Sequence, residues 1–125
     1  MTAKIHVDVV QTSSEGAVTL TKQSASKAFV NFDGKTSGGV TSRDSFNVSG
    51  LVDNGTGDYN CTLVNNMDNA NYSQVGSSHN SGVSWAMSPY TGGKTTSALD
   101  IQTANDGGVA ADSDIIDTIA CGDLA

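Results

Sequence analysis

The residues that could perform chemistry are mostly aspartates gathered in two short runs. The first run, DNGTGD, places Asp53 and Asp58 on either side of a turn, and the second spans residues 105–117 with four aspartates. Clustered carboxylate oxygens of this kind are ligands that Ca²⁺ prefers. Neither run has the Asp-X-Asp-X-Asp-Gly spacing that ends in Glu, and Asp, Asn and Gly are also common turn residues. The sequence therefore predicts no metal or other cofactor, with calcium at the second run as the open alternative.

Side chains suited to covalent or acid–base catalysis are present, but their spacing selects no catalytic group. The many serines include no Gly-X-Ser-X-Gly turn, and His6 and His79 are isolated. Nothing selects two carboxylates as the pair that a glycosidase needs. Cys61 and Cys121 lack a metal-binding spacing and are predicted to be small buried residues, although a disulfide between them is conceivable. We therefore predict that the protein is not an enzyme.

Aromatic side chains near an asparagine offer a different chemistry. A ring can stack on the apolar face of a sugar while an amide binds the hydroxyls. The stretch VSWAMSPYTGG, residues 83–93, contains Trp85 and Tyr90, and Asn80 precedes it. These three residues are the candidate glycan-binding set. The alternation of Val83 with Trp85 favours a second interpretation, in which Trp85 points into the core and Tyr90 is the exposed ring.

The composition favours one β-rich domain that would hold these residues. Of the 125 residues, 37% are hydrophobic, only 6% are aromatic, and 53 are Ser, Thr, Asn or Gly. A single proline and a low share of charged residues argue against disorder. Short strands joined by polar turns fit this composition better than helices do.

Charge and hydropathy exclude several classes of partner. The net charge is −7 and the six basic residues are scattered, so we expect no nucleic-acid partner. No apolar run is long enough to cross a membrane, and the first ten residues lack the apolar centre of a signal peptide. We therefore expect synthesis in a cytoplasm without membrane insertion.

Alternating apolar and polar residues mark the expected strands. The clearest case is SFNVSGLVDNGTGDYNCTL, residues 45–63, in which two alternating stretches flank a turn at 54–57. Gly55 and Gly57 can take the positive φ that a tight reversal needs, and the irregular alternation at residues 49–50 predicts a β-bulge. Further strands are expected at 27–32, 71–76, 83–88, 98–104 and 114–121, with a single helical turn at 67–72. Seven or eight strands predict an antiparallel β-sandwich, jelly-roll or Ig-like.

The first 27 residues differ from the rest of the chain. They contain two short alternating stretches, KIHVDVV and GAVTLT, and no aromatic residue that could anchor a core. We predict an extended N-terminal attachment arm at 1–27, ordered by a partner or a sister chain, and a sandwich domain at 28–125. The alternative is an ordinary first hairpin of the domain. The predicted partner-binding residues of the arm are its alternating aliphatics: Ile5, Val7, Val9, Val18 and Leu20.

Four motifs in the first half of the chain resemble a module of tailed bacteriophages, particularly marine ones. They are KAFVNF at residues 27–32, RDSFNVS at 43–49, DNGTGDY at 53–59 and NY at 71–72. Modules of this kind occur in tail-fibre and capsid decoration proteins. The resemblance covers roughly residues 16–73 and implies a virion surface protein that is trimeric, with no catalytic residues to carry over.

Residues and resemblance together predict a binding protein. We expect a non-enzymatic virion structural protein, a homotrimeric capsid decoration (cement) protein or short head fibre on the particle surface. Its partners would be its own sister chains and phage capsid or tail proteins. The alternative is the receptor-binding tip of a tail fibre that recognises host surface polysaccharide.

Overall fold

The computed structural model describes residues 26–80, 83–88, 94–123 and 125, with only the backbone described for 83–88. Within these ranges the chain forms eight strands and no helix, and every strand pair is antiparallel. The predicted all-β fold is therefore confirmed. The strands are β1 (Ser26–Phe32), β2 (Ser42–Phe46), β3 (Val48–Gly55), β4 (Asp58–Leu63), β5 (Ser73–Asn80), β6 (Val83–Ser88), β7 (Ala98–Thr103) and β8 (Ile115–Cys121).

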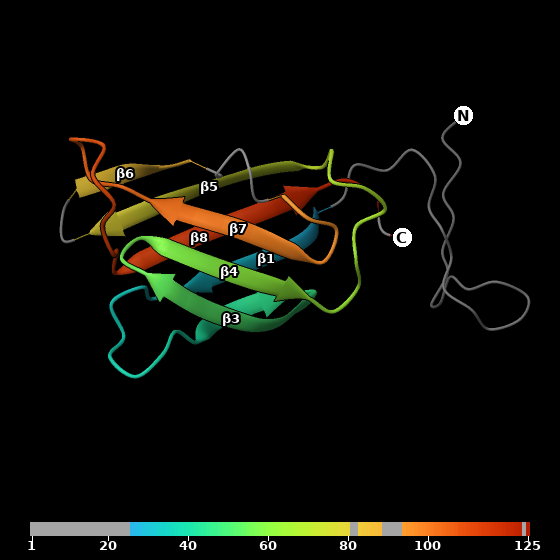
Figure 1. Ribbon diagram of the computed structural model, residues 1–125, viewed down its shortest axis with the longest axis horizontal. Helices are drawn as coiled ribbons and strands as arrows, with labels where there is room; N and C mark the ends of the chain where they lie inside the picture. Colours follow the sequence, from blue (N-terminus) through green and yellow to red (C-terminus); the bar gives the residue numbers. More distant parts are fainter. Residues whose placement is uncertain (1–25, 81–82, 89–93, 124) are drawn as a thin grey trace, which may run out of the picture.

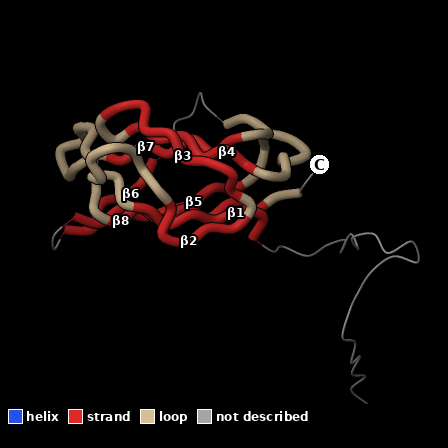
Figure 2. The backbone as a smooth tube through the Cα atoms, turned by 90° about the horizontal axis from the view of Figure 1, so that it is seen from below, coloured by secondary structure: helices blue, strands red, loops and turns tan. Residues whose placement is uncertain are grey.

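The strands form one hydrogen-bonded series that folds over into two layers. Its order is β2-β1-β8-β5-β6-β7-β4-β3. The first sheet contains β2, β1, β8 and β5, and the second contains β7, β4 and β3 (Figures 1 and 2). β6 joins them, because its first four residues pair with β5 and its last two, Met87 and Ser88, pair with β7. The two-layer sandwich matches the prediction.

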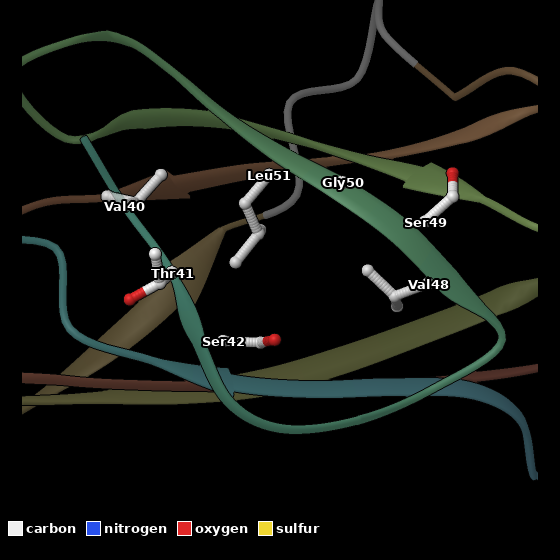
Figure 3. Close-up of a pocket in the computed structure, with 7 residues that line it drawn as sticks. All are labelled: Val40, Thr41, Ser42, Val48, Ser49, Gly50 and Leu51. Carbon is white, nitrogen blue, oxygen red and sulfur yellow. The ribbon is translucent and has the colours of Figure 1, made fainter.

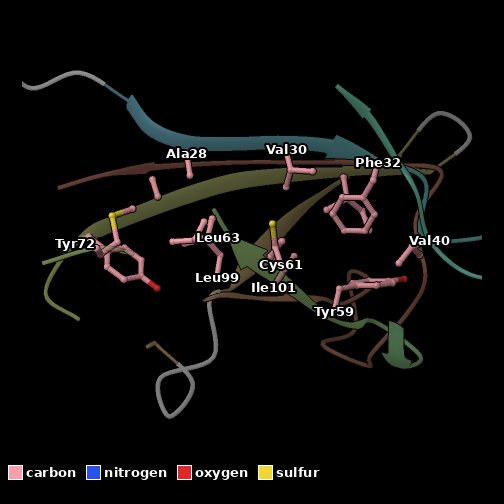
Figure 4. Close-up of a cluster of buried hydrophobic side chains, with 13 residues drawn as sticks. Ala28, Val30, Phe32, Val40, Tyr59, Cys61, Leu63, Tyr72, Leu99 and Ile101 are labelled. Atoms are coloured by element: carbon pink, nitrogen blue, oxygen red, sulfur yellow. The ribbon is translucent and has the colours of Figure 1, made fainter. Parts of the chain in front are cut away.

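The core lies between the two sheets (Figure 4). β1, β4, β7 and β8 each bury every second residue over most of their length, as strands with one face on a core must. The rings of Phe32 and Tyr59 meet across the sheets in a T-shaped pair with centroids 5.1 Å apart. The buried cluster comprises Ala28, Val30, Phe32, Val40, Tyr59, Cys61, Leu63, Met67, Tyr72, Leu99, Ile101, Ile116 and Ala120.

The stretch at 45–53, expected to be one strand, is divided at Asn47. This residue has a φ of +59°, so β2 ends in the first sheet and β3 begins in the second. Asparagine tolerates the left-handed region better than other residues with a Cβ. Its amide secures the corner: Nδ2 donates to the carbonyls of Lys27 at 2.9 Å and Asn65 at 3.0 Å, and Oδ1 accepts from the Asn65 N–H.

The helical turn expected at 67–72 is absent. Met67 is buried and its N–H donates to the carbonyl of Thr96. The N–H of Asp68 donates to the carbonyl of Asp123. Tyr72 is also buried, so two apolar side chains anchor this segment from either end. Tertiary hydrogen bonds take the backbone groups that one helical turn would have paired.

The hairpin at 54–57 and the bulge at 49–50 are both confirmed. Gly55 and Gly57 have φ of +139° and +68°, and the Asp53 carboxylate accepts a hydrogen bond from the Gly55 N–H. The register of β3 against β4 shifts between Val48 and Gly50. The two glycines differ in their surroundings. A Cβ on Gly57 would lie 2.4 Å from the Thr103 carbonyl oxygen, whereas one on Gly55 would meet open space.

The substitution Gly57→Ala should therefore destabilise the fold more than Gly55→Ala. For Gly55→Ala we expect a loss of about 1–2 kcal/mol from left-handed strain. Gly57→Ala adds a clash with backbone atoms that cannot rotate away, so we expect a loss of about 3 kcal/mol or more. Urea denaturation measures both. Gly50→Ala is the matched control, because its φ is not positive and nothing lies within 4 Å. Equal losses at Gly55 and Gly57 would contradict this account of the hairpin.

Candidate functional site

The outer face of the first sheet carries a line of apolar side chains. Phe46 pairs with Phe29, Phe29 with Ile119, and Ile119 with Val75, so the four residues cross β2, β1, β8 and β5 at one level. We call them the apolar row. Phe46 is 52% exposed, Ile119 38% and Val75 63%. Their inward neighbours fill the core, which places the row on the side of the sheet away from it.

Local contacts hold the apolar row together but do not cover it. The rings of Phe29 and Phe46 stack with centroids 6.2 Å apart. A shallow hollow of about 280 Å³ lies at the other end, between Val75 and Ile119. One step along the strands the face becomes polar, and Asn31 donates a hydrogen bond to Asp117 there. An apolar patch with a polar border is typical of a binding surface.

Sequence analysis missed the apolar row because the row exists only through strand register. The predicted strand at 27–32 contains two rings, Phe29 and Phe32. In the structure Ala28, Val30 and Phe32 are buried, and Phe29 points to the opposite face. Side chains alternate between the two faces of a strand, and residues 29 and 32 are separated by an odd number of positions. The pattern KAFVNF therefore already predicts that these two rings face opposite sides of the sheet.

A second feature is a cleft between β2 and β3, which we call the open side (Figure 3). These strands are the two ends of the sheet order and do not pair with each other. Residues 40–42 and 48–51 line a hollow of about 250 Å³, and none of them is charged. The side chains of Ser42 and Leu51 point into the gap between the strands. Leu51 also packs against the core, so apolar interior is accessible here.

The predicted site residues are only partly within the described structure. The arm residues Ile5, Val7, Val9, Val18 and Leu20 lie outside it, as does Tyr90. Trp85 is in β6, as the strand prediction requires, but its side chain is not described. Asn80 ends β5, and its Oδ1 accepts a hydrogen bond from Lys35 Nζ. Lys35 also forms an ion pair with Asp114 at 3.1 Å, so Asn80 belongs to a polar cluster at this end of the sandwich.

The acidic runs serve as turn and loop anchors in the described structure. Asp112 Oδ1 accepts hydrogen bonds from the Gly57 N–H and the Tyr59 hydroxyl, both at 2.7 Å, and thereby ties the 104–114 loop to β4. Within the described ranges, no three His, Cys, Asp or Glu residues converge where they could hold a metal ion. No helix found there is long and apolar enough to cross a membrane.

Among the described residues, three buried groups have raised pKa values. Burial raises the pKa of Tyr59 well above its usual range, and the hydrogen bond to Asp112 and that carboxylate's charge add to the shift. Burial raises the pKa of the Cys61 thiol to about 12. Burial, then the charge of Asp100, raises the pKa of Tyr72. Both cysteines are free thiols; Cys61 is buried as predicted, whereas Cys121 is partly exposed. The raised pKa values hold Tyr59, Cys61 and Tyr72 in their neutral forms.

No family model, curated protein or solved structure matches the chain.

The Tyr59 hydroxyl should make the protein sensitive to alkali. An unfolded tyrosine titrates near pH 10, and the folded pKa is higher. The contribution of the neutral Tyr59 hydroxyl to the free energy of unfolding is therefore complete below about pH 10. It is lost as the pH rises through the folded pKa. Tyr59→Phe should lower stability by about 1 kcal/mol at pH 7 through the lost hydrogen bond, and it should flatten the decline above pH 10. Urea denaturation between pH 7 and 11 tests this. Tyr72→Phe is the control, for which we expect a smaller change in the pH dependence of the free energy of unfolding. If stability declined as steeply above pH 10 in Tyr59→Phe as in the wild type, the role of Tyr59 would be contradicted.

Proposed function

We propose that the protein is a non-enzymatic structural component of a bacteriophage particle, displayed on the surface as a homotrimeric capsid decoration protein or short head fibre. The observation that supports this most is the apolar row. A soluble sandwich ordinarily presents polar side chains on the outer face of its sheet. Here four apolar residues cross four strands, and water is excluded from them only when another surface covers the row.

Sister chains are the proposed cover for the apolar row. Covering a fully exposed Val, Ile or Phe side chain contributes about 1.5–3 kcal/mol. The row is a single line of partly exposed residues. The area that it can bury is therefore smaller than the roughly 800 Å² per partner of a standard stable interface. The proposed trimer therefore needs a further contact, and the predicted arm at 1–27 would supply it by strand addition to the particle or to a neighbouring chain.

The state of the buried ionisable groups supports a binding role. A catalytic nucleophile or base needs a pKa shifted toward the working pH and access to substrate. Tyr59, Cys61 and Tyr72 have shifts in the opposite direction and lie in the core. Each acts in packing or in hydrogen bonds that support the sheets.

The alternative function is a receptor-binding tip for host surface polysaccharide. The observation in its favour is the polar cluster at one end of the sandwich, where Asn80, Lys35 and Asp114 lie together. Such groups can bind sugar hydroxyls. Imaging of labelled particles separates the two functions, because a decoration protein is distributed over the capsid and a tip is confined to the tail.

The trimer should be visible in solution and should depend on the apolar row. Light scattering of the full chain at micromolar concentration should give a mass close to three times 12.7 kDa. Val75→Asp or Ile119→Asp should shift the protein to monomers with an unchanged fold, because a carboxylate would be desolvated at the interface. Val109→Asp is the matched control, since Val109 is equally exposed but lies in a loop outside the row. A wild-type monomer would rule out the trimer.

Removal of the arm should separate folding from attachment. Deleting residues 1–25 leaves every described strand in place, so we expect a folded sandwich with a cooperative melting transition. The same deletion should abolish incorporation into particles, measured by the protein content of purified virions. Normal occupancy would show that attachment lies in the sandwich. Failure to fold would show that the first strands belong to the core.

A further inference from the structure

The open side is an acceptor for an added strand. β2 and β3 each have one edge whose backbone groups face no other strand in the sheet order. The space between these edges is not filled by the described side chains, and a Cβ placed on Gly50 would have no heavy atom within 4 Å. Exposed edges of this kind pair readily with another extended chain.

The lining of the open side defines the occupant. None of the lining residues is charged, and Val40, Val48 and Leu51 present apolar side chains to the hollow or the core behind it. A matching segment must be extended, about five residues long and apolar at every second position on one face. Its other face can be polar, because that face remains in water.

We propose that residues 4–10 of a neighbouring copy occupy the open side as an added strand. The stretch KIHVDVV has Ile5, Val7 and Val9 on one face and His6 and Asp8 on the other. Its apolar face carries no charge, as the lining requires. This inference rests on the trimer of the proposed function and names the binding site of the arm.

The position of the apolar row favours a neighbouring copy as the donor. The row ends at Phe46 on β2, and the same strand forms one wall of the open side. A sister chain that covers the row is thus adjacent to the cleft. The 15 residues from 11 to 25 precede Ser26 at the start of β1 and can span up to about 50 Å. Three copies that each donate one arm and accept another form a closed ring with no acceptor left empty.

Disulfide cross-linking tests the pairing. The variant Val7→Cys/Ser42→Cys, made with Cys121→Ser to remove the partly exposed native thiol, would be oxidised as the intact trimer with oxidised glutathione. We expect most chains to become covalent dimers and trimers on a non-reducing gel. The control pair Val7→Cys/Val109→Cys places the second thiol in an exposed loop away from the cleft and should remain monomeric. A cross-link within one chain, or cross-linking equal to the control, would overturn the proposal.

Amide hydrogen exchange provides a second measurement without added cysteines. Val7→Asp in the full chain should reduce the protection of amides at 48–52, because the acceptor edge loses its partner. Val10→Asp, a matched change on the opposite, water-facing side of the same stretch, should leave these amides protected. Equal protection in wild type and Val7→Asp would overturn the inference. Light scattering of the same samples distinguishes failure of this inference from failure of the proposed function. A trimer that does not cross-link refutes only the proposed binding site of the arm. A monomeric wild type refutes the proposed trimer itself.

Discussion

The left-handed corner at Asn47 is the constraint on which the rest of the structure depends. A strand that continued straight through residues 45–53 would belong to one sheet. At φ +59° the chain instead passes to the other sheet, and the hydrogen bonds that the Asn47 amide donates and accepts hold it there. Corners of sandwiches are commonly made by strands that change sheets in this way. The consequence is that β2 and β3 become the two free ends of the sheet series.

Much of the sandwich could be predicted from alternation and turn residues alone. The strand patterns and the glycines at 55 and 57 indicated the correct elements because each depends on local sequence. The corner at Asn47 could not be found in the same way, since Phe46 and Val48 continue an apolar pattern whether or not the chain turns between them. The failed helical turn at 67–72 has a similar cause. Its backbone is held by Thr96 and Asp123, which are distant in sequence.

The candidate surfaces were less predictable than the fold. Val75 and Ile119 become neighbours only through the register of β5 and β8, two strands separated by β6 and β7 in sequence. Residue types alone instead indicated the aspartate runs as a candidate calcium site and the Trp–Tyr stretch as a candidate glycan-binding site. Asp53 and Asp112 prove to bind backbone amides. The arm residues and Tyr90 stay predictions, because they lie outside the described ranges.

The open side is limited in ways that favour one specific occupant over unrestricted edge pairing. β2 has only five residues, and Arg43 near its start is paired with Asp33. Along β3 the register shifts at 48–50, and Asp53 lies exposed before the hairpin. Short strands, bulges and charges at the ends of an edge all oppose indefinite strand addition. Only the middle of the cleft combines an open edge with apolar lining, so a short apolar segment fits where a long strand would meet charge or irregular backbone.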